Sequence, residues 1–293
     1  MRIALTGADG MLGQALMARL ADHDLCALTE PSFSLEDREG VLDALAGAAP
    51  EWVVHTAAMT NVDGCEQNPT RAYRINAMGT RYVAEACARC GAGLVYISTD
   101  FVFGPRRMRR PIEAWETGDP LSAYGLAKWG GERFVEALAP RWIIARTAWL
   151  YGEGGTHFVG TILKKAREGL PLRVVNDQTG CPTYARDVAE GVDALLQREA
   201  VGWFHLVNTG EATWFELARR TVELAGLDPD GVQPCTSEDV ARPAPRPAYS
   251  VLSTLTYREA TGGDLRPWSD ALKDYLTGGA GEERRPSLCP SPP

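Results

Sequence analysis

Short apolar runs and longer helical patterns alternate along the first half of the chain. The apolar runs begin at Ile3, Leu25, Trp52, Leu94 and Trp142, and they are rich in aliphatic and β-branched residues. Between them, apolar residues recur at helical spacing, which predicts helices over 11–21, 41–49, 72–90 and 124–138. Strands that alternate with helices predict a parallel sheet covered on both faces, so the expected fold class is α/β.

The pattern loosens after Tyr151, where helices are expected over 158–168, 183–198, 214–225 and 268–276 and strands over 172–175 and 203–207. We expect residues 1–149 to form a dinucleotide-binding domain whose sheet is completed by about 171–207. A smaller α/β cap that binds the substrate is expected from 150–170 and 211–277. Residues 278–293, which end in Pro-Ser-Pro-Pro, are expected to form a disordered tail.

The charge balance argues against nucleic acid and anionic membranes as partners. The 293 residues contain 30 Lys and Arg against 38 Asp and Glu, a net charge of −8, so no basic surface is available to hold phosphates. No apolar run approaches the roughly 18 residues of a bilayer span, and the first strand begins without the pattern of a signal peptide. Seven scattered cysteines indicate free thiols in a reducing compartment, so we expect a cytoplasmic protein.

A glycine-rich turn, Thr6-Gly7-Ala8-Asp9-Gly10-Met11-Leu12-Gly13, follows the first strand and begins the first helix. Gly7 permits the tight turn, Gly10 lets the backbone approach a pyrophosphate, and Gly13 lets the helix pack on the sheet. The bare amides at the helix start then receive the anion. A purely structural turn is the alternative. The position inside a strand–turn–helix unit favours a dinucleotide contacted by Gly7, Asp9, Gly10, Met11, Leu12 and Gly13.

The GxxGxxG spacing resembles that of the extended short-chain dehydrogenases/reductases, which predicts a Tyr-x-x-x-Lys pair further along the chain. Tyr124 and Lys128 supply this pair. Positions i and i+4 share one helix face, so the phenol and the ammonium project into one cleft. A free tyrosine has a pKa of about 10. We expect the nearby cation to lower the pKa of Tyr124 by roughly 1–3 units, towards the range useful for a general acid. A solvated surface pair is the alternative for this motif by itself.

A hydroxyl group stands at the end of the strand before that helix, in the run Ile97-Ser98-Thr99-Asp100. Ligands of doubly wound sheets bind at the carboxyl ends of the strands. Thr99 is therefore placed to bond a substrate carbonyl, whereas a hydroxyl pair that merely caps a turn is the alternative.

Further motifs resemble one family over nearly the whole chain. They are STDFVFG at Ser98, YGLAKWGGE at Tyr124, RTAWLYG at Arg146, NDQTGCPT at Asn176, and the segment from Arg242 to Leu252. With the glycine turn, they are similar to those of the dTDP-4-dehydrorhamnose reductases. The resemblance implies a Rossmann-type doubly wound sheet and an NAD(P)-dependent oxidoreductase. It would reduce the C4 keto group of dTDP-4-dehydro-L-rhamnose to dTDP-L-rhamnose, with NADPH or NADH.

The same resemblance implies roles for individual residues at the substrate. Tyr124 would protonate the C4 oxygen, Lys128 would hold the nicotinamide ribose, and Thr99 would bond the keto oxygen. Asp100 would border the sugar and Trp149 would contact it. Phe101 stands where related dehydratases have a glutamate, so elimination of water is disfavoured.

On the cofactor side, the resemblance places Asn76 near Lys128 and its water. Thr56, Ala57 and Ala58 would lie beside the adenine and its ribose. Strand two is expected to end near Glu30, where a carboxylate bonds a ribose diol and repels a 2′-phosphate, which slightly favours NADH.

Two other functions stay open. One is the reduction of another nucleotide-linked 4-keto deoxysugar, since the base and sugar pockets cannot be read from the motifs. The other is a non-catalytic, NADP-binding regulatory subunit, because the β subunit of methionine adenosyltransferase resembles these reductases.

Other features have simpler interpretations. Cys87 and Cys90 have metal-like spacing without a second pair, so we expect helix-surface thiols and no metal. The basic run over 106–110 is expected to be a solvated loop, with a contact to the substrate diphosphate as the alternative. The sequence does not determine the oligomeric state, for which we keep a homodimer as the expectation.

Overall fold

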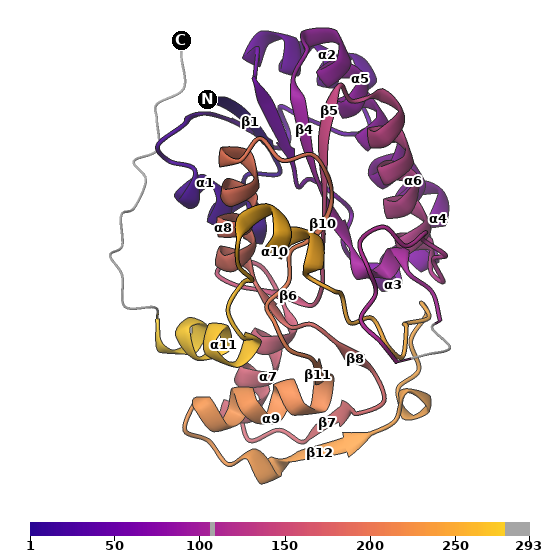
Figure 1. The fold of residues 1–293 in the computed structure, drawn as a ribbon. Helices are drawn as coiled ribbons and strands as arrows, with labels where there is room; N and C mark the ends of the chain where they lie inside the picture. The colour runs from indigo at the N-terminus through magenta and orange to yellow at the C-terminus, as the bar shows by residue number, and fades with distance from the viewer. Residues whose placement is uncertain (106–108, 279–293) are drawn as a thin grey trace.

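Six parallel strands form the central sheet of the computed structural model, which describes residues 1–105 and 109–278 (Figure 1). They are β1 (Arg2–Thr6), β2 (Asp24–Leu28), β3 (Trp52–His55), β4 (Gly93–Thr99), β5 (Arg141–Thr147) and β10 (Gly202–His205), in the order β10-β5-β4-β3-β1-β2. Every residue of β3 and β4 is buried, as expected for strands covered on both faces. The α/β class and the doubly wound sheet are confirmed.

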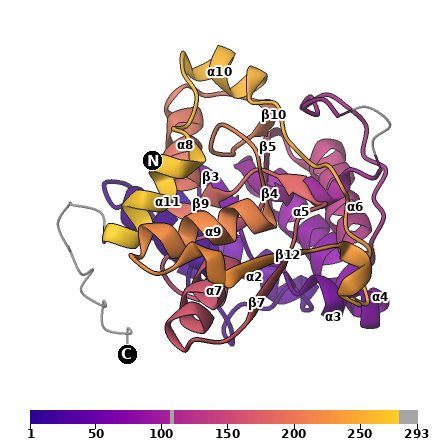
Figure 2. The same cartoon turned by 90° about the horizontal axis from the view of Figure 1, so that it is seen from below.

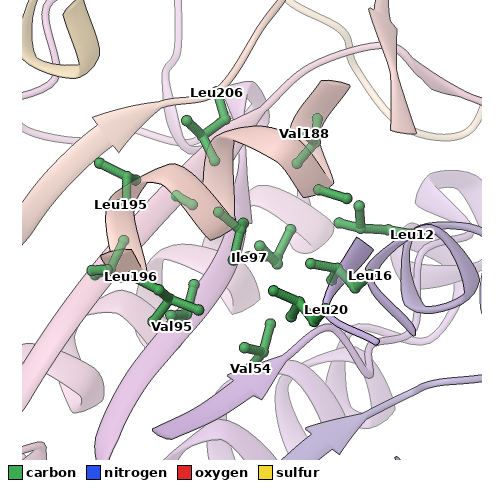
Figure 3. Packing of buried hydrophobic residues seen from close by; sticks show 14 of the residues in the cluster. Leu12, Leu16, Leu20, Val54, Val95, Ile97, Val188, Leu195, Leu196 and Leu206 are labelled. Carbon is green, nitrogen blue, oxygen red and sulfur yellow. The ribbon is translucent and has the colours of Figure 1, made fainter. Parts of the chain in front are cut away.

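Two groups of helices cover the faces of this sheet. On one face lie α1 (Met11–Arg19) and α8 (Ala185–Gln197), and on the other lie α2 (Arg38–Ala48), α5 (Thr80–Cys90) and α6 (Ala123–Leu138). Figure 3 shows the first face, where leucines of α1 and α8 pack on Val54, Val95 and Ile97 of the strands. Each helix thus buries its apolar stripe against the sheet.

The helix predicted over residues 72–90 is divided into three parts. The structure has α4 (Pro69–Tyr73), a π-helical turn over Arg74–Gly79 and then α5, with the short α3 (Val62–Gln67) before them. A π turn adds a residue to the helical repeat and recurs at functional sites. The apolar spacing did not reveal it, because the residues on both sides still follow a helical pattern.

Three two-stranded sheets and three helices lie below the central sheet (Figures 1 and 2). The strand pairs are β6 (Leu150–Tyr151) with β9 (Thr183–Tyr184), β7 (Leu172–Val175) with β12 (Val232–Cys235), and β8 (Thr179–Gly180) with β11 (Ala212–Thr213). The helices are α7 (Phe158–Arg167), α9 (Trp214–Leu224) and α11 (Trp268–Thr277). Ile162, Val174 and Val222 belong to a separate apolar core of this lower part.

Two segments pack differently from the expectation. Of residues 171–207, only β10 pairs within the central sheet, because β7 pairs with β12 instead. In the segment 211–277, α10 (Leu255–Thr261) packs against β10 and α8, and its Tyr257 joins the core under the central sheet. Of the disordered tail expected over 278–293, Gly278 ends α11 as its C-cap, and residues 279–293 lie outside the described part of the chain.

The carboxyl ends of four central strands meet above the lower part. Thr6 at the end of β1 is in register with His55 of β3, and Thr99 of β4 with Thr147 of β5. After β1 the chain forms β2 on one side of it and then crosses back to form β3 on the other side, so the order of the strands reverses at β1. Such a switch point is where open α/β sheets bind their ligands.

Candidate active site

A cavity of about 1670 Å³ occupies this switch point, between the central sheet and the small sheets. Pockets for a single small ligand usually measure about 300–1,000 Å³, so this cavity has room for two ligands side by side. Fifteen residues proposed from the sequence line it: Gly7, Asp9, Gly10, Met11, Leu12, Gly13, Glu30, Thr56, Ala57, Ala58, Thr99, Asp100, Tyr124, Lys128 and Trp149. Asn76 is the proposed residue that does not line it.

The glycine turn forms one end of the cavity. Gly7 has φ +68°, a backbone conformation that side chains with a Cβ rarely adopt. A Cβ on Gly13 would lie 2.0 Å from the Gly7 carbonyl oxygen, so only glycine lets α1 start this close to the turn. Gly10 caps α1 without any side-chain hydrogen bond. The first amides of α1 are therefore free of a side-chain cap and can bind an anion.

The ends of β2 and β3 border the same part of the cavity. The Thr56 hydroxyl donates to the Thr6 carbonyl at 2.7 Å, which ties the end of β3 to that of β1. Glu30 is exposed just beyond β2 and lines the cavity. Glu30 thus brings a carboxylate to the same cavity as the glycine turn, and its contact with a ribose stays a prediction.

Tyr124 lies in the first turn of α6 and is 9% exposed. The Ser122 side chain caps this helix by accepting a backbone hydrogen bond, and the Phe101 ring meets the Tyr124 ring edge-on at 5.7 Å. Burial, and after it the Asp100 carboxylate, raises the pKa of Tyr124 above its ordinary value of 10.0. The expectation that Lys128 lowers this pKa is therefore wrong, because the loss of solvation of the phenol outweighs the hydrogen bond with Thr99, the neighbour that lowers it.

Lys128 lies one turn after Tyr124 on the same face of α6, and it is buried. Its Nζ donates to the Ile97 carbonyl at 2.7 Å and lies 4.1 Å from the centre of the Tyr96 ring. Burial lowers the pKa of this ammonium to about 7, against the opposing effect of Glu132. The predicted pair thus shares one cavity wall, although the lysine bonds to β4.

Thr99 and Asp100 form the floor beside Tyr124. The Thr99 hydroxyl donates to the Asp100 carboxylate at 3.1 Å and accepts a hydrogen bond from the Phe101 amide at 3.2 Å. It also interacts with Tyr124 in the direction that lowers the tyrosine pKa. Burial raises the pKa of Asp100 to about 6. A hydroxyl, a phenol and a carboxyl group are thus clustered at the end of β4.

Asn76 acts on the cavity indirectly. It lies in the π-helical turn, where its Oδ1 accepts from the Met59 amide at 2.8 Å and its Nδ2 donates to the Met59 carbonyl at 2.9 Å. Met59 lines the cavity, so Asn76 fixes one of its walls. The role of Asn76 towards Lys128 stays a prediction.

Trp149 is stacked on an aromatic residue that sequence reasoning missed. Its backbone is left-handed, with φ +47°, in the short connection between β5 and β6. Its ring lies 3.6 Å from that of Trp214 at an angle of 6°. Trp214 Nε1 donates to the Gln178 side chain at 3.2 Å, and all three residues line the cavity. Gln178 belongs to the NDQTGCPT motif, but no local pattern marks a stacking partner that lies 65 residues along the chain.

A second missed contact joins the two sides of the cavity. Asp63 of α3 accepts hydrogen bonds from Arg246 at 2.9 and 3.0 Å and from the Ala244 amide at 3.2 Å. The Arg246 guanidinium lowers the pKa of this carboxyl. These residues line the cavity, as do the basic side chains Lys165, Arg173 and Arg242 of the lower part. Arg246 lies in the proline-rich stretch 242–247, which is typical of a loop, but no residue near it in sequence identified Asp63 as its partner.

Some expected features lie elsewhere. Residues 106–108 of the basic run are outside the described part of the chain. Arg109 donates to Thr179 at 3.0 Å and Arg110 to Glu116 at 2.8 Å, and neither arginine lines the cavity.

Cys87 is buried, in contrast to the expected surface thiol. Residues 1–105 and 109–278 contain no group of three His, Cys, Asp or Glu placed for a metal and no helix able to cross a membrane.

The cavity therefore combines a glycine turn able to bind an anion with a proton donor that lines the same cavity. A phenol held protonated at neutral pH can give a proton to a developing oxyanion, and the neighbouring hydroxyl can bond the same oxygen. The bare helix start and the Glu30 carboxylate suit a dinucleotide. The constellation is that of hydride transfer to a carbonyl group.

Comparisons with known proteins point to one family. The family model of the RmlD substrate binding domain matches residues 1–280. A dTDP-4-dehydrorhamnose reductase of Mycolicibacterium smegmatis is 40% identical over 94% of this chain and 85% of its own. A probable dTDP-4,6-dihydroxy-2-methyloxan-3-one 4-ketoreductase of Streptomyces antibioticus is also 40% identical, over 94% of both chains.

Solved structures agree with this result. The structure of a dTDP-4-dehydrorhamnose reductase from Bacillus anthracis in complex with NADP matches this chain with a TM-score of 0.91, and its sequence is 33% identical. The match covers 94% of this chain and 99% of that one. The architecture described above is therefore shared over nearly its whole length.

Proposed function

The chain belongs to the RmlD substrate binding domain family, that of the dTDP-4-dehydrorhamnose reductases, and is an NAD(P)-dependent oxidoreductase. From this premise we propose that it reduces the C4 keto group of dTDP-4-dehydro-L-rhamnose to give dTDP-L-rhamnose. The observation that carries the proposal is the placement of Thr99, Tyr124 and Lys128 in the cavity whose other end is the bare glycine turn.

The coenzyme is NADPH or NADH, and we assign it to the side formed by residues 1–149. Its pyrophosphate would lie on the first amides of α1, between Gly10 and Gly13, where the helix dipole favours negative charge. Thr56, Ala57 and Ala58 would lie beside the adenosine, and Glu30 would bond its ribose. When bound, the nicotinamide supplies the hydride that reaches C4 of the sugar.

The sugar nucleotide is assigned to the side formed by the small sheets. Lys165, Arg173 and Arg242 line this part of the cavity and suit the charge of a diphosphate. The stacked Trp149 and Trp214 rings offer an apolar wall to a deoxysugar, whose methyl group and ring hydrogens are apolar.

Tyr124 supplies the proton that the new hydroxyl group needs. The phenol donates its proton to the carbonyl oxygen as hydride reaches carbon, and Thr99 bonds the same oxygen. The raised pKa of Tyr124 keeps the phenol protonated at neutral pH. Lys128 stabilises the resulting phenolate, which regains a proton from solvent. Without substrate the Thr99 hydroxyl donates to Asp100, so its one hydrogen would turn from that carboxylate to the keto oxygen when the sugar binds.

A different keto sugar is the second candidate. The Streptomyces antibioticus relative, whose name specifies another dTDP-linked ketone, is as similar to this chain as the Mycolicibacterium reductase. A panel of dTDP-linked 4-keto sugars therefore belongs in the first experiment. A regulatory subunit without catalysis is the less favoured alternative, because Thr99, Tyr124 and Lys128 are all in place.

The test follows coenzyme oxidation by absorbance, with NADPH and NADH each offered together with enzymatically generated dTDP-4-dehydrorhamnose. We expect oxidation by the wild-type chain and a loss of about a hundredfold in kcat for Tyr124→Phe, the usual contribution of a general acid. Coenzyme affinity should stay nearly unchanged. Tyr73→Phe, a change at an exposed tyrosine of α4 outside the cavity, is the matched control.

Either of two results would contradict the proposal. Full activity in Tyr124→Phe would remove the proton-donor role. Absence of oxidation with every sugar, in protein that binds NADPH, would leave the regulatory subunit as the better interpretation.

A further inference from the structure

A buried ion pair lies directly behind the catalytic wall. Glu132 of α6 is 0% exposed and Arg146 of β5 is 1% exposed. Arg146 donates through Nε to one Glu132 oxygen at 2.8 Å and through a terminal nitrogen to the other at 2.7 Å. Ser98 of β4 donates to the same carboxylate at 2.6 Å. The carboxylate therefore joins three separate elements of the fold.

The Glu132 carboxylate and its two partners lie close in sequence to residues of the proposed site. Ser98 precedes Thr99 on β4. Glu132 lies one helical turn beyond Lys128 and two turns beyond Tyr124, so all three share a face of α6. Arg146 is three residues before Trp149 and also donates to the Ala114 carbonyl at 2.8 Å. The ion pair thus connects the segments that carry the proton donor, the hydroxyl and the tryptophan.

Stability is a weak reason for a pair at this depth. Desolvation of two charges roughly cancels their attraction, and apolar replacements of similar shape are often neutral or stabilising. What the pair adds is geometry, because a bidentate guanidinium–carboxylate contact fixes distance and angle more tightly than apolar packing does. Misplacement of reacting groups by about 1 Å can cost about a hundredfold in rate.

We propose that Glu132 and Arg146 are positioning residues that lock α6 against β4 and β5, so that Tyr124 on α6 and Thr99 on β4 converge on the keto oxygen that receives the proton. The proposal rests on the proposed reductase function. Neither residue lines the cavity, so they act through the side chains they orient.

The first test is Arg146→Lys, which keeps the charge and removes the planar fork. We expect kcat per coenzyme-binding site to fall at least tenfold, with little change in the KM for either substrate, because binding surfaces are intact and only alignment is lost. Ser98→Ala, which removes one hydrogen bond to the same carboxylate, should also lower kcat, by several-fold. Because Ser98 also lines the cavity, amide exchange over residues 123–132 decides the question with this variant if Arg146→Lys does not fold.

The matched control is Arg266→Lys. Arg266 makes a bidentate contact with the buried Asp187 at 2.8 and 2.9 Å, outside the cavity. Loss of this bidentate contact should lower the melting temperature, as loss of the bidentate contact between Arg146 and Glu132 does. It should leave kcat per coenzyme-binding site unchanged. An equal fall of kcat in both variants would overturn the positioning role and indicate a general stability effect.

Amide hydrogen exchange gives a result that does not depend on the substrate. In Arg146→Lys, amides over residues 123–132 should exchange faster than in the wild type, whereas Arg266→Lys should leave them unchanged. If these amides exchange in Arg146→Lys at the wild-type rate, the proposal is overturned. If wild-type protein reduces no sugar, the proposed function fails, and the exchange experiment still decides whether the pair holds α6.

Discussion

Burial changes the acid–base properties of individual side chains at this site more than their charged neighbours do. The Lys128 ammonium faces the Ile97 carbonyl and the Tyr96 ring, with Tyr124 and Glu132 one turn away on either side. Its pKa falls from 10.5 to about 7. Below pH 7 the lysine is charged in both the folded and the unfolded chain, so the cost of burying it is fully present there.

This pKa predicts a pH-dependent stability. Between pH 7 and 10.5 the unfolded chain binds more protons than the folded one, so the free energy of unfolding rises with pH through this window. In the absence of coenzyme, Lys128→Met should be more stable than the wild type at pH 6, by on the order of 1–3 kcal/mol. The advantage should shrink as pH approaches 9.5. Urea titrations at pH 6, 8 and 9.5 measure it.

The control is Lys164→Met, at an exposed lysine of α7, which should change stability by less than about 0.5 kcal/mol at pH 6. A stability difference between Lys128→Met and the wild type that stays constant over the whole range would contradict the assigned burial effect.

At the scale of elements, helix α1 depends on its approach to the turn before it. A Cβ on Gly13 would meet the Gly7 carbonyl oxygen and the Ala8 backbone at 2.0 and 2.8 Å, and backbone atoms cannot move aside cheaply. The turn and the helix start are also where the coenzyme pyrophosphate is assigned. Helix packing and coenzyme binding are therefore linked through this one position.

Gly13→Ala should lower the free energy of unfolding by about 1–3 kcal/mol, the usual cost of overpacking, and weaken NADPH binding at least tenfold. Gly47→Ala is the matched control in α2, where a Cβ meets nothing within 4 Å. That change should stabilise the fold by about 0.4–1 kcal/mol, because alanine favours a helix, and leave coenzyme affinity unchanged. Denaturant titrations and coenzyme fluorescence distinguish the two. Equal coenzyme affinity in both variants would contradict the assignment.

At the scale of the whole molecule, Asp63 and Arg246 connect chain segments 183 residues apart. Asp63 belongs to the sheet side, and Arg246 to the proline-rich stretch on the side of the cavity that we assign to the sugar. The two residues close one wall of the cavity. Since the guanidinium lowers the pKa of Asp63, the contact is present above the ordinary pKa of an aspartate and is lost in acid.

Asp63→Asn should raise the KM for the sugar nucleotide several-fold, with a smaller effect on the KM for NADPH, because the loosened segment faces the sugar. Steady-state kinetics with each substrate varied in turn measures this difference. Asp24→Asn, which removes an exposed contact with Arg2 at the far end of the sheet, is the control. An unchanged KM for the sugar would show that this wall does not contribute to its binding.

Much of the fold and of the site followed from local patterns. Strand and helix alternation predicted the doubly wound sheet, and the glycine spacing predicted a turn that the structure places at the cavity. The Tyr124 and Lys128 pair needed only the helical repeat. These features depend on residues close in sequence, through backbone sterics and side-chain periodicity, so the sequence by itself determined them.

Other features were decided only by the tertiary structure. The stacking of Trp149 on Trp214, the pairing of β7 with β12 and the contact of Asp63 with Arg246 all join distant segments. The direction of the Tyr124 pKa shift was reversed for the same reason. Solvation depends on everything packed around a group, whereas the sequence spacing revealed only its nearest charged neighbour.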